Sequence, residues 1–360
     1  MSQFSFPEPN HFTSPLFEKL QRHPKRIVFV DGEDRRVVRV AGRMIELSLG
    51  IPILLGNRAR IMALVKEEGV RNEFLRVIDP AKSSDLDLFA GRLERIERFR
   101  GQTIFDAKET VSKAVNFGAM MIQYGQADGL VGGNITTATG IFRSLLHFIS
   151  PMPGIAKVFG VTVLVAEHLK HFGREGVLFF ADSGLVPRPS VDELASIAVN
   201  TGHLAGHYLG RRPRVAMLSH STLGSAATKP ALKVQAATEK ARAMSSAIDL
   251  EIDGELQADV ALDARAAEVK IPQQERKEPA DVLVFPNLDA AHISMKLLQH
   301  TAGAVNYGQI VMGLSRPAAQ VPRTASEETI LGTAAAIGVE AIKGHELYPY
   351  GEVSSVNSIF

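Results

Sequence analysis

The stretch Arg26-Ile27-Val28-Phe29-Val30-Asp31-Gly32, followed by Val37 to Leu49, decides the fold class of this chain. Its first five residues form a β-branched and aromatic run that stops at Asp31-Gly32, and Val37 to Leu49 carries apolar residues at helical spacing. This pattern predicts a strand, a loop and a helix. It returns at 51–55 with 60–68 and at 128–133 with 139–149. Short buried strands alternating with helices are typical of a largely parallel sheet covered on both faces, so we predict an α/β fold.

A second α/β unit is predicted beyond Ser150-Pro151-Met152-Pro153-Gly154, because two prolines and a glycine prevent the preceding helix from continuing. Strands are expected at 158–165, 176–180, 214–218 and 282–285, and helices at 191–209 and 232–244. Residues 260–279 are interpreted as a helix end and a surface loop. The remaining elements are expected to be a strand at 309–314, a polar loop at 315–326 and an alanine-rich helix at 327–342.

Length and composition limit the possible functions. The chain has 360 residues, which suggests two domains, with 45% hydrophobic and 22% charged residues. Its 40 Lys and Arg against 39 Asp and Glu leave a net charge of +1, so no global charge favours nucleic acid or an anionic membrane. The lack of cysteine excludes disulfides, thiolate catalysis and Cys-bound metals. We expect a soluble, cytoplasmic protein, since Met1 to Asn10 has no secretory pattern and no stretch is long and apolar enough for a membrane span.

Loops that directly follow strands are the candidate ligand sites, because ligands of open α/β sheets bind beyond the carboxyl ends of the strands. Such loops are rich in glycine and small polar residues at 31–35, 132–139, 181–184, 219–225 and 315–326. Hydroxyls, glycines and a few arginines suit an oxyanion, and phosphate is the simplest ligand of that kind. The alternative is that these residues only cap helices and form turns.

Several familiar motifs are missing. The chain has no G-x-x-x-x-G-K-[ST], G-x-S-x-G or H-E-x-x-H, and Gly129 to Gly133 is not a G-x-G-x-x-G loop. His203 and His207 have the spacing of helical metal ligands, but no third acidic ligand is evident, so no metal site is predicted. His220 follows a strand and is either an acid–base group or a hydrogen-bonded loop residue.

Arginines are the cations that a bound phosphate would require. Arg143 lies about one turn into the helix after the Thr-rich loop, where it would reach a ligand or would pair with a carboxylate. Arg98 and Arg100 belong to the charged run from Arg92 to Arg100, which is typical of a solvated helix face.

Taken in their order along the chain, the candidate loops resemble those of the phosphate acetyltransferase and phosphate butyryltransferase family. This family includes the related C-terminal domain of NADP-dependent malic enzymes. The resemblance runs from about Arg26 to Ile342. It is carried by residues 31–37, 127–133, 136–138 with Arg143, 180–182, 214–219, 224–226, 253–259 and 284–290.

The resemblance implies a homodimer of two-domain subunits, with a fold like that of isocitrate or isopropylmalate dehydrogenase and a site in the interdomain cleft. Residues 1–150 and 315–360 would form the first domain, and residues 151–314 the second, which would carry the dimer interface on the predicted helices at 191–209 and 232–244. The implied reaction converts acetyl-CoA and phosphate to acetyl phosphate and CoA, with no metal or prosthetic group.

Site residues follow from the resemblance by position, together with the loop argument. Catalytic roles are expected for Arg323, Arg143 and His220. Contacts to phosphate, acyl phosphate or CoA are expected for Thr136, Thr137, Ser219, Ser221, Thr222 and Arg98.

One loop departs from the family pattern, which reads approximately D-L-S-R-G-C-S-x-E-D-I where this chain has Gln320 to Ile330. The family's serine is Pro322 here, and its aspartate, the presumed base, is Thr329. Glu327 or Glu328 would replace that base only from a different helix face. Three hypotheses therefore stay open: an acyltransferase with altered acid–base residues, a non-catalytic acyl-CoA or acyl-phosphate sensor like the malic enzyme domain, and another enzyme on this scaffold.

Overall fold

The computed structural model describes residues 6–101, 104–153, 155–169, 172–245, 249–273 and 278–347. The chain divides into two compact units: unit 1 is Met1–Glu8, Leu16–Pro151 and Leu314–Phe360, and unit 2 is Pro9–Pro15 and Met152–Gly313. Residues 9–15 belong to unit 2 because Phe12 packs edge-on against Phe179 and Tyr208, at ring-centroid distances of 6.2 and 5.7 Å.

Unit 1 contains a five-stranded parallel array. Its strands, in spatial order, are β3 (Arg76–Ile78), β2 (Gly50–Leu55), β1 (Lys25–Phe29), β4 (Gly129–Gly132) and β11 (Ala318–Gln320). In the central pair, Phe29 lies opposite Val131. Because all five strands run the same way, their carboxyl ends meet at one edge, and the loops that leave them are neighbours.

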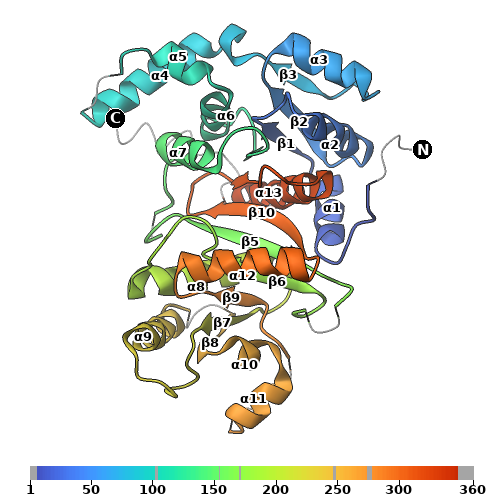
Figure 1. The fold of residues 1–360 in the computed structure, drawn as a ribbon. Coiled ribbons are helices and arrows are strands. Elements are labelled where there is room, and N and C mark those ends of the chain that lie inside the picture. The colour runs from blue at the N-terminus through green and yellow to red at the C-terminus, as the bar shows by residue number, and fades with distance from the viewer. Residues whose placement is uncertain are drawn as a thin grey trace. The chain divides into compact units, whose positions relative to one another are not determined.

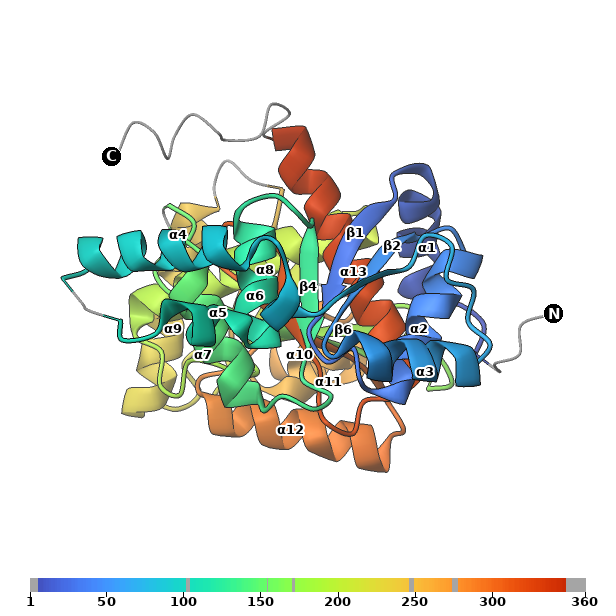
Figure 2. The same cartoon turned by 90° about the horizontal axis from the view of Figure 1, so that it is seen from above.

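Helices cover both faces of the unit 1 strands (Figures 1 and 2). They are α2 (Arg35–Glu46), α3 (Arg58–Glu67), α4 (Leu86–Phe99), α5 (Ala107–Ser112), α6 (Ala114–Gln123), α7 (Ala138–Phe148) and α13 (Glu327–Leu347), with α1 (Thr13–Arg22) beside them. Successive side chains of a strand point to opposite faces of the sheet. Val28 and Leu130 therefore lie against Gly118 of α6 on one face, whereas Gly129 lies against α13 on the other. A Cβ added at Gly129 would come within 2.3 Å of the Ile337 side chain, so this close approach requires glycine.

Unit 2 contains a mixed array. Its strands, in spatial order, are β10 (Val305–Met312), β5 (Phe159–Val165), β6 (Val177–Ala181), β9 (Val282–Val284), β7 (Arg214–Leu218) and β8 (Glu251–Leu256). β5 is antiparallel to both of its neighbours, whereas β6, β9, β7 and β8 are parallel to one another. The predicted α/β fold with largely parallel strands is confirmed, and β5 and β10 are the antiparallel exception.

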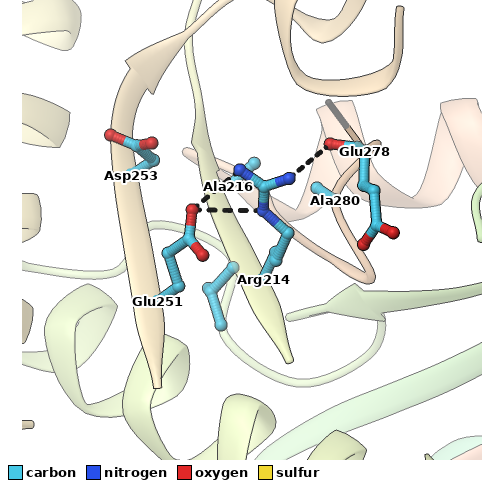
Figure 3. Close-up of a pocket in the computed structure, with 7 residues that line it drawn as sticks. Arg214, Ala216, Glu251, Asp253, Glu278 and Ala280 are labelled. Carbon is cyan, nitrogen blue, oxygen red and sulfur yellow. Dashed lines mark hydrogen bonds and ion pairs between the residues drawn. The ribbon is translucent and has the colours of Figure 1, made fainter. Parts of the chain in front are cut away.

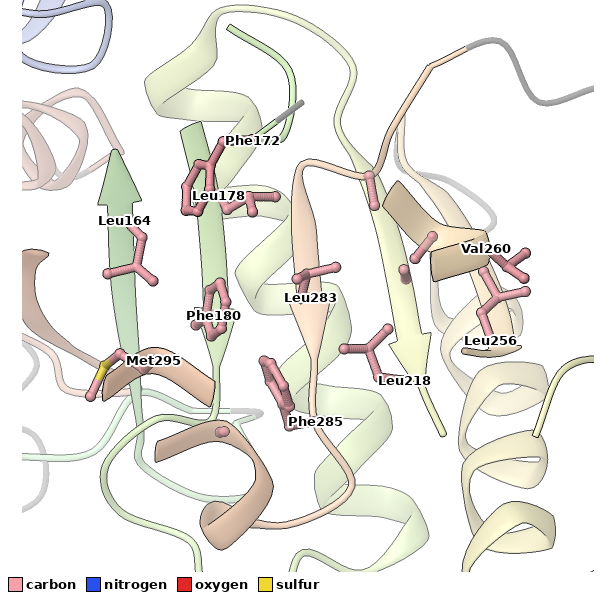
Figure 4. Packing of buried hydrophobic residues seen from close by; sticks show 14 of the residues in the cluster. Leu164, Phe172, Leu178, Phe180, Leu218, Leu256, Val260, Leu283, Phe285 and Met295 are labelled. Atoms are coloured by element: carbon pink, nitrogen blue, oxygen red, sulfur yellow. The ribbon is translucent and has the colours of Figure 1, made fainter. Parts of the chain in front are cut away.

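Two helical layers bury the faces of the unit 2 strands. On one face Phe179 stacks against Tyr208 of α8 (Val191–Leu209), beside α9 (Lys229–Met244). On the other face Phe180 and Leu283 pack with Phe285 and with residues of α10 (Ala258–Leu262), α11 (Ala264–Lys270) and α12 (Leu288–Thr301), forming the core shown in Figure 4. Burial of this apolar area, at roughly 25 cal/mol per Å², stabilises the unit.

The polar loop predicted at 315–326 is wrong in part, because it contains the strand β11, which pairs in parallel with β4. Ala318, Ala319 and Gln320 are all buried, and their small or polar side chains lack the β-branched signal of a strand. The surface loop predicted at 260–279 contains the short helix α11, while residues 274–277 lie outside the described chain. No helix among the described residues is long and apolar enough to cross a membrane.

Candidate functional site

Three loops meet at the carboxyl edge of the unit 1 strands: 30–34 after β1, 133–137 after β4 and 321–326 after β11. A backbone hydrogen bond joins the loops after β4 and β11, since Val321 donates its N–H to the Gly132 carbonyl at 2.8 Å. Gly133 has φ +128°, and a Cβ there would lie 2.1 Å from the Val321 carbonyl oxygen. Only glycine therefore allows the two loops to approach this closely.

The carboxylate of Asp31, 4% exposed, organises the loop after β4. Its Oδ2 accepts the N–H groups of Gly133 and Asn134 at 2.7 and 2.8 Å. Its Oδ1 accepts both the N–H and the hydroxyl of Thr136, at 3.0 and 2.6 Å. The backbone amides that the sequence suggested for an oxyanion ligand are thus bound to an internal carboxylate.

Thr136 and Thr137 remain predicted phosphate contacts, and the structure gives each hydroxyl an internal partner. The Thr136 hydroxyl points its proton at Asp31, while the Thr137 hydroxyl caps α7 by accepting the Gly140 N–H at 3.2 Å. The Nδ2 atom of Asn134 is buried and has no hydrogen-bond partner among the described residues. It is a donor that a ligand oxygen would satisfy.

Arg323 and Arg143 are both exposed cations of unit 1. Arg323 donates to the carbonyl of Ile135 at 3.3 Å, which places its guanidinium at the loop after β4. The Arg36 guanidinium donates to the carbonyls of Arg323 and Ala325 at 3.0 and 2.7 Å, and so fixes the loop after β11 to the start of α2. The structure therefore brings Arg323 together with the loop that carries Thr136 and Thr137.

Arg143 lies on α7, six residues after the capping Thr137, and forms no ion pair with another described residue. Arg98, on α4, is likewise exposed. The neighbouring Arg100 contacts α7 instead: it lies 3.3 Å from Glu97 and donates to the carbonyl of His147 at 3.0 Å. The structure thus links Arg100, rather than Arg98, to the helix that carries Arg143.

In the loop that departs from the family pattern, Ser326 caps the start of α13. The backbone N–H of Thr329 donates to the Ser326 hydroxyl at 3.1 Å, and the two hydroxyls lie 3.3 Å apart. Thr329 is buried on α13, whereas Glu327 accepts from Arg39 at 3.0 Å. Position 329 is therefore close to the loop, and Glu327 is already paired.

In unit 2 the loop after β7 is held by Glu255, a buried residue at the end of β8. The hydroxyl of Ser221 and the N–H of Gly224 both donate to Glu255 Oε1 at 2.8 Å. Thr222 accepts the N–H of Gln257 at 3.0 Å. Ser221 and Thr222 are thus buried in contacts that shape the loop.

Of the predicted site residues in this loop, Ser219 and His220 are more accessible than Ser221 and Thr222. The Ser219 hydroxyl accepts the Ser221 N–H at 3.2 Å. The Nε2 atom of His220 lies 3.0 Å from the hydroxyl of Thr228, the residue that caps α9. His220 is exposed, so its ring is available to a ligand as well as to Thr228.

The loop after β6 is also held by a buried carboxylate that accepts backbone N–H groups. Asp182 accepts the N–H groups of Gly160 and Gly184 at 2.8 Å, together with those of Leu185 and Val186. Burial raises the pKa of the Asp182 carboxyl, and these donors act in the opposite direction. Sequence reasoning missed that Asp31, Asp182 and Glu255 hold these loops in shape. The available signal was an acidic residue within two positions of a buried strand end.

A small pocket of unit 2 lies at the opposite, amino ends of β7 and β8 (Figure 3). Arg214 crosses it, donating to Glu251 at 2.8 and 3.1 Å and to the carbonyl of Glu278 at 2.8 Å. Because its central cation is already paired and it contains none of the predicted site residues, we interpret this pocket as structural.

Comparisons with known proteins agree with the resemblance. A family model described as "Phosphate acetyl/butaryl transferase" matches residues 11–337. A phosphate acetyltransferase from Thermoanaerobacterium thermosaccharolyticum is 36% identical over 326 residues, covering 91% of this chain and 98% of that protein. A phosphotransacetylase structure from Streptococcus pyogenes has a TM-score of 0.82 at 33% identity, with coverage of 91% and 97%. The EutD phosphotransacetylase from Staphylococcus aureus has a TM-score of 0.81 at 29% identity, with coverage of 92% and 98%.

Proposed function

This chain belongs to the phosphate acetyl/butyryl transferase family, and on that premise we propose that it is an acyltransferase that converts acetyl-CoA and phosphate to acetyl phosphate and CoA. The observation that carries the proposal is the similarity to a phosphate acetyltransferase over 98% of that protein's length. The exposed Arg323 at the joined loops of unit 1 supports it, because a phosphate dianion requires cations and donors.

In the proposed reaction a phosphate oxygen forms a bond to the thioester carbonyl carbon, and the carbon–sulfur bond then breaks. Arg323 and Arg143 neutralise the phosphate and fix its approach to the carbonyl. Fixed donors stabilise the negative charge that develops on the carbonyl oxygen and on the departing sulfur. His220 is the proposed acid–base group, which protonates the leaving thiolate and accepts the CoA thiol proton in the reverse direction.

The thioester is already an activated acyl donor, so we propose that the transfer uses no metal or prosthetic group, with CoA only as substrate and product. Dialysis against EDTA is expected to leave the rate unchanged. We further propose a cytoplasmic homodimer that binds neither nucleic acid nor membrane, in line with the near-neutral charge and the cysteine-free sequence.

The second candidate is an acyl-CoA or acyl-phosphate sensor without turnover. It is favoured by Pro322, which supplies neither a hydroxyl nor an N–H, and by Thr329, whose hydroxyl faces Ser326. Against it, a CoA thiol of pKa near 8.5 is already ionised to a few per cent at neutral pH, so an acyltransferase tolerates the loss of a base.

The two candidates are separated by a thiol-release assay with acetyl-, propionyl- and butyryl-CoA, with and without phosphate, alongside binding calorimetry. An acyltransferase releases CoA only when phosphate is present, and the relative rates give the acyl-chain preference. Binding of acyl-CoA with no phosphate-dependent release would select the sensor.

A further inference from the structure

Resting on the proposed function, we propose that Asp31 is the positioning residue of the phosphate-binding loop. Its buried carboxylate acts as an internal oxyanion around which residues 133–136 fold. Asp31 itself is not proposed to contact the substrate. It holds the loop in the shape that presents Arg323 to phosphate.

The acceptor capacity of Asp31 is fully used by this one loop. A carboxylate offers about four lone-pair positions, and four donors from Gly133, Asn134 and Thr136 fill them at 2.6–3.0 Å. Hydrogen bonds to an ionised acceptor are roughly twice as strong as neutral ones. A single side chain therefore fixes three of the four residues 133–136 of this loop.

Sheet register places Asp31 opposite the start of the loop. Phe29 of β1 lies across from Val131 of β4, so Asp31 and Gly133, each two residues further, leave the paired strands side by side. The loop is thereby fixed to the paired strands β1 and β4 of unit 1. This juxtaposition joins residues 102 positions apart in the chain.

The effect of Asp31 passes through Ile135. This residue lies between the bound amides of Asn134 and Thr136, so the direction of its carbonyl is set by the folded loop. The Arg323 guanidinium donates to that carbonyl at 3.3 Å. Loss of the Asp31 contacts would release the carbonyl and leave Arg323 without its anchor on this loop.

Asp128 provides a matched control at the other end of the same strands. Its carboxylate also joins β1 to β4, accepting the Arg26 backbone N–H at 2.7 Å and the Arg26 guanidinium at 2.8 and 3.1 Å. The Asp128 side chain is 7% exposed, so this carboxylate is also largely shielded from solvent. It differs in lying at the amino edge, away from the loops.

The test compares Asp31→Asn with Asp128→Asn in the full chain. An amide has one acceptor oxygen, so in Asp31→Asn an NH₂ group faces two of the four loop donors. We expect the KM for phosphate to rise at least tenfold, about 1.4 kcal/mol, while the KM for acetyl-CoA changes less than about twofold. Asp128→Asn is expected to leave both KM values within about twofold of wild type.

An unchanged phosphate KM in folded Asp31→Asn, or an equal rise in Asp128→Asn, would overturn the inference. If Asp31→Asn does not fold, amide hydrogen exchange of the wild-type protein tests the inference instead. We expect the backbone N–H groups of residues 133, 134 and 136 to exchange slowly without phosphate, and fast exchange would refute the role of Asp31. A wild type without phosphate-dependent CoA release refutes the proposed acyltransferase instead, and the exchange measurement still tests the loop.

Discussion

Arg323 and Arg143 are the residues on which phosphate binding is expected to depend most. Each supplies an exposed guanidinium in unit 1, and a charge-assisted hydrogen bond contributes about 1.5–3 kcal/mol. We therefore expect Arg323→Ala and Arg143→Ala each to raise the KM for phosphate by roughly 10- to 100-fold in steady-state assays.

Two other arginines serve as comparisons for this measurement. Arg71 is exposed in unit 1 between α3 and β3, so Arg71→Ala should leave the phosphate KM unchanged. Arg98→Ala is expected to have a smaller effect than either Arg323→Ala or Arg143→Ala. Unchanged phosphate affinity in both principal variants would remove the proposed phosphate site.

Single residues also show how far sequence reasoning reaches. The residue types of the loops indicated an oxyanion site, but not which donors are already used inside the protein. Asp31 meets Gly133 only through strand pairing, and no local spacing connects residues 102 positions apart. Ser221 likewise reads as a ligand hydroxyl in sequence, whereas folding buries it against Glu255.

The loop between β11 and α13 is the element that separates an active enzyme from a sensor. If Pro322 and Thr329 mark lost serine and aspartate chemistry, the double change Pro322→Ser and Thr329→Asp should raise phosphate-dependent CoA release at least tenfold. Tenfold is about 1.4 kcal/mol of barrier, whereas a restored acid–base group is worth roughly 10²–10⁴ in rate. An aspartate at 329 also suits the first turn of α13.

The variant Pro322→Ser with Thr329→Asn matches the restored pair in shape but lacks the base, so it should show no gain. A fast wild type and a slower restored variant would mean that catalysis rests on other residues, with His220 and Glu328 next to test. If both proteins bind acyl-CoA and neither turns over, the sensor becomes the better description.

Helices α2, α3 and α13 are tied by Glu68, which follows α3. Its carboxylate accepts from Arg35 and, at 2.6 Å, from Arg39, which also binds Glu327 of α13 at 3.0 Å. The Arg39 guanidinium holds the pKa of the Glu68 carboxyl below its ordinary 4.5, against burial, which raises it. Glu68 therefore stabilises the fold above pH 4.5, and this contribution is lost as the pH falls through the lowered pKa.

We accordingly expect Glu68→Gln to lower the free energy of unfolding by about 1 kcal/mol at pH 7, as measured by urea denaturation. The difference from wild type should disappear at pH values below the folded-state pKa. Glu67→Gln removes an exposed partner of Arg35 and should have almost no effect. A difference that persists in acid would show that packing, not charge, accounts for it.

Elements with strong patterns were predictable and short ones were not. The helix predicted at 191–209 and the strand predicted at 214–218 are observed with those bounds, because each has a long apolar periodicity or a β-branched run between clear breaks. The strand β8 contains three acidic residues and a glycine, and β11 has only three residues, so neither carried a usable local signal. Both exist because neighbouring strands pair with them.

At the scale of the whole molecule, we expect a homodimer that forms through α9 of unit 2. The family resemblance implied an interface on both predicted helices, 191–209 and 232–244, but α8 buries most of its residues inside its own unit, from Leu194 to Tyr208. On α9, Leu232 and Met244 are 49% and 44% exposed. Closed two-fold pairing is the commonest way in which such apolar side chains are covered in a homo-oligomer.

Sedimentation at micromolar concentration should give twice the 39.0 kDa chain mass. Replacing Leu232 and Met244 by Glu should shift the equilibrium to monomer, because burying two unpaired carboxylates in an interface costs several kcal/mol. Ile293→Glu with Leu297→Glu is the matched control, since these apolar residues of α12 are 58% and 56% exposed. A monomeric wild type would refute the dimer. If only the α12 variant dissociates, the interface lies on α12 and not on α9.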